Sequence, residues 1–155
     1  MVATDAMKKN GFTLMELLIA ISIVAILMAI GIVSYGTINK QSRDTRRKSD
    51  LEQIRSALEM YRADKGYYPN AGGGSFTEIS SGLAADLVTG GYIAALPTDP
   101  KSGSMIYEYQ ALNRSADDNN YYGYCLSAQL ESETPTSTPC TPDSASGHNY
   151  ATKNP

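Results

Sequence analysis

The sequence predicts an α+β fold, in which one long N-terminal helix packs on a small antiparallel sheet. An uncharged apolar stretch near the start of the chain runs directly into a stretch with apolar residues at helical spacing, which predicts the helix. Short runs with alternating aromatic residues, bounded by turn-forming residues, predict strands in the second half. The 155 residues leave room for one small domain beside the apolar stretch.

The apolar stretch is long enough to cross a membrane. Residues 17–39 carry no charge, and at about 1.5 Å per residue a helix of this length spans a hydrocarbon core of about 30 Å. Glu16 lies at the mouth of the stretch, and no charge follows until Lys40. A carboxylate in apolar surroundings is costly without a partner, and the stretch itself offers no charged one. We therefore expect Glu16 to find its partner on another molecule, which indicates an assembly protein.

The helix is predicted to continue beyond the apolar stretch, because apolar residues recur three and four positions apart at Leu51, Ile54, Leu58 and Tyr61. Gly66 suits the end of a helix, and Pro69 prevents its continuation. We expect one helix over residues 12–65. Its membrane-spanning and assembly half covers residues 12–39, and its amphipathic half covers residues 40–65.

Residues 66–155 are predicted to form a small head. A glycine-rich loop follows the helix, and a short helix is expected at residues 83–88. Strands are predicted at residues 105–110 and 121–130, with a weaker one at 148–152. The linker over residues 113–120 is polar, and residues 131–154 are interpreted as a surface tail rich in Ser, Thr and Pro. The strand tyrosines are expected to be half-buried with their hydroxyls in solvent.

Charge is unevenly distributed along the chain. Eight of the thirteen Lys and Arg residues lie in residues 40–65, whereas from residue 66 onward nine acids face three bases, so no specific nucleic acid is expected as a partner. The basic cluster from Arg43 to Lys48 is interpreted as an ion-paired helix face, with lipid headgroups or nucleic acid as the alternatives. Helical spacing predicts pairs within the helix, such as Arg46 with Asp50.

Two cysteines, Cys125 and Cys140, lie in the last third of the chain. Without a nearby histidine they form neither a zinc site nor a CxxC redox motif, so a disulfide in an oxidising space is favoured over two free thiols. Such a bond stabilises a fold by roughly 2–4 kcal/mol.

The segment KKNGFTLMELLIA, residues 8–20, resembles the class III leader and N-terminal segment of type IV pilins and of the related pseudopilins. The resemblance implies that a prepilin peptidase cuts after Gly11 and removes a leader of residues 1–11. It implies N-methylation of the new N-terminal residue, Phe12. Glu16 is then the fifth mature residue, which in this family is thought to balance the positive N-terminus of a neighbouring subunit.

The resemblance also implies a pilin-like fold and a set of partners. The chain would be a single-pass membrane protein with its head outside the cytoplasm, and after assembly part of a cell-surface filament. It would polymerise with itself and with minor pilins, on a pilus assembly platform, through an apolar helix surface represented by Leu18, Ile19, Ile23, Ile26 and Ile30.

The favoured function is therefore that of a structural subunit of a type IV pilus-like filament. One alternative is a pseudopilin of a type II secretion or DNA-uptake system. An alternative of another class is a single-pass, membrane-anchored binding module that never polymerises. Adhesion, motility, DNA uptake and secretion are all open, as is the choice between a major and a minor subunit.

Enzymatic chemistry is not expected. The only histidine, His148, is interpreted as a surface residue of the tail, and no catalytic motif is present in the sequence. The run LPTDP followed by IYEY resembles major secretion pseudopilins, whose head loop binds calcium. Asp117 and Asp118 could supply oxygen ligands for Ca²⁺, but their spacing matches neither an EF-hand nor the pseudopilin ligand pattern. A solvated loop without cofactor is favoured.

Overall fold

The structure is a computed structural model that describes residues 11–101, 106–132, 140 and 148–154, with the backbone alone at 33 and 34. The chain divides into two compact units, Met1–Ile38 and Asn39–Pro155. We call residues 11–38 the apolar unit and the described residues from 39 onward the head. Leader residues 1–10, and tail residues 133–139 and 141–147, lie outside the described part.

The long helix is α1, Leu14–Lys65. It begins two residues later than predicted, because Thr13 has no helical backbone and instead caps the first turn. It ends as predicted: Gly66 adopts a left-handed backbone, with φ of 86°, and its N–H donates to the carbonyl oxygen of Arg62 at 2.7 Å.

The head contains a four-stranded antiparallel sheet in the order β1-β2-β3-β4. Its strands are β1 (Thr77–Glu78), β2 (Glu108–Arg114), β3 (Tyr121–Ala128) and β4 (Tyr150–Lys153). The three predicted strands are therefore present. β2 ends four residues later than expected, because Leu112 and Arg114 continue its pairing with β3. β1 was not foreseen, because two residues leave no periodicity.

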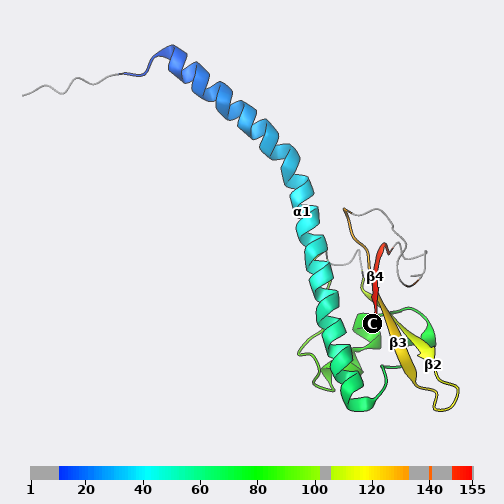
Figure 1. Cartoon of the computed structure of the whole chain (residues 1–155). Helices are drawn as coiled ribbons and strands as arrows, with labels where there is room; N and C mark the ends of the chain where they lie inside the picture. The colour runs from blue at the N-terminus through cyan, green and yellow to red at the C-terminus, as the bar shows by residue number, and fades with distance from the viewer. Residues whose placement is uncertain (1–10, 102–105, 133–139, 141–147, 155) are drawn as a thin grey trace, which may run out of the picture. The chain divides into compact units, whose positions relative to one another are not determined.

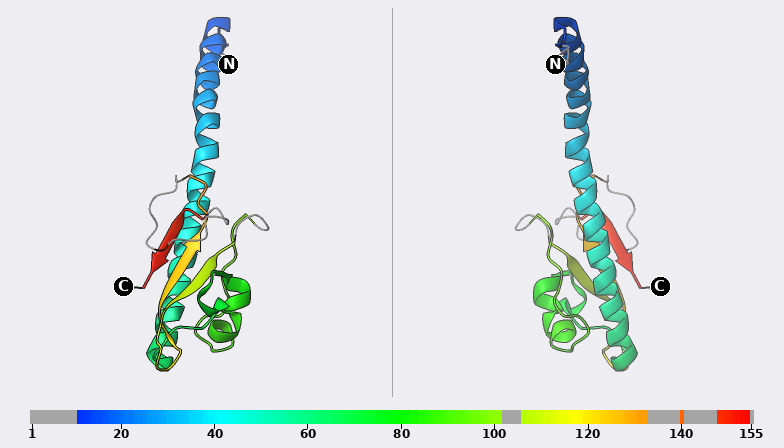
Figure 2. Two further views of the ribbon diagram at one scale, coloured as in Figure 1. Left: turned by 90° about the vertical axis from the view of Figure 1, so that its right-hand side faces the viewer. Right: turned by 90° about the vertical axis from the view of Figure 1, so that its left-hand side faces the viewer.

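Three short helical pieces lie between α1 and β2, on either side of β1. They are η1 (Gly72–Gly74), α2 (Ile79–Gly82) and the single π-turn η2 (Ala84–Val88), which is the short helix predicted at residues 83–88. Figure 2 shows α2 and η2 beside β2, on the side of the sheet away from β4.

The sheet covers the inward face of α1 within the head, as Figure 1 shows. The four apolar residues predicted for this face are all buried, with Leu51, Ile54 and Leu58 fully so. They pack with residues of the sheet and of the connecting pieces, including Leu83, Leu87, Tyr109, Tyr124 and Leu126. Helical periodicity alone thus located one wall of the core.

The tyrosine hydroxyls of this core do not face solvent, contrary to the prediction. Tyr107 donates to Asp50 at 2.7 Å, and Tyr109 donates to the carbonyl oxygen of Pro69 at 2.8 Å. The hydroxyl of Tyr124 donates to Glu59 at 3.1 Å. Buried hydroxyls need partners, and acids of α1 supply two of these three. Helical spacing had predicted that Asp50 pairs with Arg46. Asp50 instead accepts a hydrogen bond from the hydroxyl of Tyr107 in the core.

Arg47 lies at the centre of a buried ionic cluster. Its side chain is fully buried and contacts one carboxylate from each of three separate segments. Its Nε donates to Asp99 at 2.6 Å, and its Nη1 donates to Asp44 at 2.8 Å and to Glu131 at 3.0 Å. Side-chain exposure of these acids is 4 to 8%. Backbone pairing does not join these segments, so the guanidinium fastens two loops to α1.

Arg43 extends the cluster with two 2.7 Å bonds to Glu131. Hydrogen bonding to Arg43 lowers the pKa of Glu131 to about 2, against the opposing effect of burial. The two arginines are thus paired inside the chain, which confirms the ion-paired interpretation of the basic cluster for these two positions.

The C-terminal part of the chain is tied to the sheet at several points. The predicted disulfide joins Cys125 and Cys140, whose Cα atoms are 6.2 Å apart. The side-chain amide of Asn149 pairs with both backbone groups of Leu130, at 2.6 and 2.9 Å.

His148 is buried, so its interpretation as a surface residue was wrong. Its Nδ1 lies 3.0 Å from the Ser127 hydroxyl and 2.8 Å from the Glu108 carboxylate. Both partners contact the same ring nitrogen, so the three residues do not form a catalytic relay, in which base and orienting acid need different nitrogens.

Replacing Arg47 should destabilise the head far more than replacing Arg43. Arg47→Met leaves three poorly exposed carboxylates without their shared cation and should cost roughly 3–5 kcal/mol in the free energy of unfolding. Arg43→Met should cost about 1 kcal/mol, because its side chain is one-third exposed and Glu131 keeps Arg47. Urea unfolding of the full chain in detergent, followed by the near-ultraviolet circular dichroism of the tyrosines, measures both. Equal losses would contradict the central position of Arg47.

The head should lose part of its stability in acid through Glu131. The folded pKa of about 2 lies below the ordinary value of 4.5, so the contribution is complete above pH 4.5 and disappears as the pH falls toward 2. Glu131→Gln should therefore weaken the head at neutral pH and flatten the decline of its melting temperature over this range. Glu52→Gln, at an exposed position of α1, is the matched control and should retain the wild-type slope.

Candidate functional site

The residues at the predicted cleavage position are accessible. Phe12 is 90% exposed, and a Cβ atom placed on Gly11 would meet no atom within 4 Å. Gly11, Phe12 and Thr13 precede the first helical turn and have no regular structure. A protease reaches a scissile bond most easily where the backbone is exposed and outside regular structure. Cleavage after Gly11 and methylation of Phe12 stay predictions.

Glu16 takes part in a capping box at the start of α1. The amide and the hydroxyl of Thr13 both donate to Glu16 Oε2 at 2.9 Å, and the amide of Glu16 donates back to Thr13 Oγ1 at 3.2 Å. These reciprocal bonds satisfy N–H groups that the first helical turn leaves unpaired.

This geometry corrects the expectation that Glu16 has no partner in its own segment. The partner is the neutral Thr13, which a search for opposite charges misses, although the pattern T-x-x-E before an apolar run is a recognisable capping signal. Both bonds from Thr13 end on the same oxygen, Oε2. The carboxylate is therefore oriented by its own helix, and Oε1 accepts no hydrogen bond from a described residue.

The apolar unit exposes the side chains that the sequence assigned to assembly. Their exposed fractions range from 48 to 63%, at Leu18, Ile19, Ile23, Ile26 and Ile30. By length and composition α1 could cross a membrane, and none of its apolar 18-residue stretch is buried. Such a surface needs lipid or other helices around it.

A shallow apolar cavity of about 420 Å³ interrupts this surface at Gly31, where no side chain fills the space. Met28, Ile32 and Tyr35 line the rest of it. A small residue flanked by large ones gives a helix surface a hole into which a side chain of a second helix can pack.

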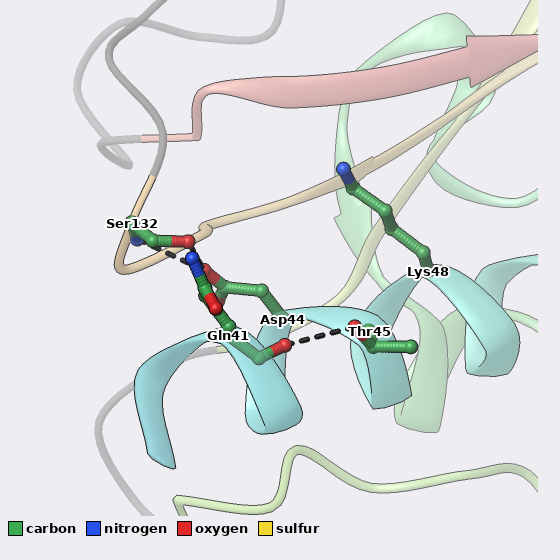
Figure 3. A pocket seen from close by; sticks show the side chains of 5 residues that line it. All are labelled: Gln41, Asp44, Thr45, Lys48 and Ser132. Carbon is green, nitrogen blue, oxygen red and sulfur yellow. Dashed lines mark hydrogen bonds between the residues drawn. The ribbon is translucent and has the colours of Figure 1, made fainter. Parts of the chain in front are cut away.

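The head has a polar cavity of about 380 Å³ beside α1, lined by Gln41, Asp44, Thr45, Lys48 and Ser132. Figure 3 shows Asp44 and Ser132 pointing toward each other, while Lys48 extends toward β4, where its Nζ lies 5.1 Å from the centre of the Tyr150 ring. Asp44 accepts bonds from the amide and hydroxyl of Ser132. Asp44 and Ser132 are thus bonded to each other, and the hydroxyl of Thr45 donates to the carbonyl oxygen of Gln41 at 2.9 Å.

The two candidate calcium ligands, Asp117 and Asp118, do not form a common site in the described part of the chain. Asp118 accepts bonds from the Tyr122 hydroxyl at 2.5 Å and from the Asn120 amide at 3.0 Å, and these bonds lower its pKa to about 2. The side chain of Asp117 contacts no partner in the described residues. Within the described ranges, no three His, Cys, Asp or Glu side chains form a group that could hold a metal ion. The absence of a cofactor stays a prediction.

Two families match the chain. A family described as "Prokaryotic N-terminal methylation motif" matches residues 6–32. A family described as "Type II secretion system (T2SS), protein G" matches residues 35–123, more than half of the chain.

Individual relatives agree with the second family. The type II secretion system core protein G of Escherichia coli K12 is 38% identical over 105 residues, which cover 64% of this chain and 70% of that protein. The protein of the same name from Vibrio cholerae is 32% identical over 104 residues, covering 64% and 70%. The pilin-like protein PilA3 of Thermus thermophilus is 32% identical over 57 residues, covering 36% and 24%. No solved structure matches.

The capping box predicts a specific effect of the Thr13 hydroxyl. Thr13→Val keeps the branched shape but removes the acceptor of the Glu16 amide, which should then exchange its hydrogen roughly fivefold faster. Thr13→Ser retains the hydroxyl and should exchange at nearly the wild-type rate. Hydrogen exchange of the full chain in detergent micelles, followed by nuclear magnetic resonance, makes the comparison. Equal rates in all three chains would show that this hydroxyl does not cap the helix.

Proposed function

The chain belongs to the type II secretion system protein G family, and on this basis we propose that it is a pseudopilin processed after Gly11, methylated on Phe12 and polymerised through the apolar half of α1. The relatives of this chain are structural pseudopilins, and a pilin-like filament subunit is the function that they share with it. The predicted pilin-like α+β fold is confirmed.

The exposed apolar unit is the observation that carries the proposal. Nearly every large side chain from Leu14 to Ile32 is at least half exposed, which is unfavourable in water and favourable in lipid or against other helices. The chain therefore needs two successive environments for the same surface. A membrane supplies the first, and neighbouring copies in a filament supply the second.

Glu16 would set the register of this packing. Cleavage after Gly11 creates a positively charged amine on Phe12, four residues before a carboxylate whose Oε1 has no bond from a described residue. The amine of an adjacent copy would fit this oxygen, while Thr13 holds the other one in place. Opposite charges in poorly hydrated surroundings attract strongly, and an unpaired one is penalised, so misaligned copies are disfavoured.

The proposal includes location and partners. The apolar helix and the processing motif anchor the chain in a membrane before assembly. We place the leader on the cytoplasmic side and the head outside, with a prepilin peptidase, an assembly platform and minor subunits as partners. The disulfide supports an oxidising space for the head.

The comparisons favour a secretion pseudopilin over a surface type IV pilus. The secretion family covers most of the head, whereas the pilin-like relative matches 24% of its own length. The remaining candidate, an anchored binding module that stays monomeric, predicts retention of the leader and single copies in detergent.

Replacement of Glu16 should separate processing from assembly. Glu16→Ala leaves the residues beside the cleavage position unchanged, so mass spectrometry should find a trimmed, methylated chain starting at Phe12. The same chain should enter filaments at a tenth or less of the wild-type yield, because the Phe12 amine of a neighbour loses its counter-ion. Filaments isolated from cells and quantified by immunoblot measure the yield.

Gly11→Leu is the matched control, since it should leave the precursor untrimmed and the carboxylate intact. Normal filament yield from Glu16→Ala, or normal trimming of Gly11→Leu, would contradict the corresponding step of the proposal.

A further inference from the structure

The head has two ends, which are defined by their position along α1. We call the turns of α1 from Asn39 to Asp50 the proximal end, because the chain enters the head there. The distal end contains the last turns of α1, η2 and the β2–β3 loop. Tyr92, which follows η2, donates to Asp64 at 2.6 Å, and the amide of Tyr68 bonds to Tyr121 at 2.8 Å. At 1.5 Å per residue, Lys40 in the proximal end and Asp64 in the distal end lie about 36 Å apart along α1.

Unpaired positive charges lie at the proximal end. Arg43 and Arg47 are paired with acids of their own chain. Lys40 and Arg46 are exposed, and neither makes an ion pair or a side-chain hydrogen bond with any residue that the structure describes. Because Arg46 is exposed, a second molecule can approach it.

Unpaired negative charges lie at the distal end. Asp117 is exposed in the β2–β3 loop, and its side chain has no hydrogen-bonding partner in the described part of the chain. Asp86, in η2, is half-buried and likewise accepts no hydrogen bond from a described residue. Burial raises the pKa of Asp86, as expected for a carboxylate without a nearby cation. The bases at this end do have partners: Lys65 pairs with Asp64, and Arg114 bonds to Asn119.

We propose that the proximal end of one head docks on the distal end of the head of a second copy, with Arg46 of one copy facing Asp117 of the next and Lys40 and Asp86 adding to the attraction. This inference rests on the proposed polymerisation. Copies in a filament built on the same apolar unit point the same way and are staggered along its axis, so the proximal end of one head can meet the distal end of another. A contact between two different patches repeats from copy to copy, and it produces a filament where its rotation does not close into a ring.

Chemical cross-linking can test this contact. Neither position is buried, so Arg46→Cys and Asp117→Cys should leave the fold intact, and the native cysteines are already joined. The full chain carrying both new cysteines, treated in filaments with a short bismaleimide, should give a ladder of dimers, trimers and longer products. Each single variant should give no ladder. Ser56→Cys with Asp117→Cys is the matched control, because Ser56 is exposed nearly three turns further along α1 and should not form one.

Charge reversal supplies an independent test. A surface ion pair changes an equilibrium constant by about two- to fivefold per contact, and the loss recurs at every subunit. Arg46→Glu and Asp117→Arg should each reduce filament yield at least threefold, more strongly at low salt, and the double variant should recover most of the yield. Mutants that match the wild type, combined with no ladder, would overturn the contact while leaving polymerisation intact.

Two further outcomes separate this inference from its premise. If Arg46→Glu alone lowers the yield, Asp117→Arg has no effect and the ladder is absent, Arg46 contacts lipid headgroups or another protein, and the proposal is wrong. If the unmodified chain forms no filaments at all, the proposed function itself fails, and this contact fails with it.

Discussion

The helix α1 carries apolar side chains in both of its halves, and each half needs its own shield from water. Within the head the sheet covers the inward face of the helix, and Leu51, Ile54 and Leu58 disappear from solvent. In the apolar unit the side chains remain exposed, so lipid or other helices must provide what the chain does not. The same helix therefore belongs to a folded domain at one end and to an assembly at the other.

The two ends of α1 use acidic residues in different ways. At its start, one oxygen of Glu16 accepts hydrogen bonds from the neutral Thr13. These bonds orient the carboxylate and leave its negative charge unneutralised. In the head, Arg47 gathers three buried carboxylates whose segments share no backbone pairing. A buried cation of this kind fixes the positions of the loops more than it adds net stability, because desolvation of four charged groups offsets much of the attraction.

The head is closed by contacts of several chemical kinds. A disulfide fixes Cys140 to β3, an amide pair joins Asn149 to Leu130, and His148 bridges Glu108 and Ser127. Most charged side chains of the described head form ion pairs or hydrogen bonds within the chain. The few that are left over, Arg46 and Asp117 among them, stand out for that reason, and a second copy can supply their partners.

Local signals in the sequence determined the course of α1, its end at Gly66, the inward face of its second half and the membrane-length apolar stretch. Each depends on residues close together along the chain, and periods of two or 3.6 report such structure directly. The disulfide was predicted because the two cysteines fit neither a zinc site nor a CxxC motif. Only the tertiary structure decided where Arg47 finds its acids, that the tyrosine hydroxyls turn inward and that His148 is buried, since these contacts join residues 40 to 90 positions apart in most cases. No local pattern encodes which of several distant acids a buried group will meet, because that choice depends on how the whole core packs.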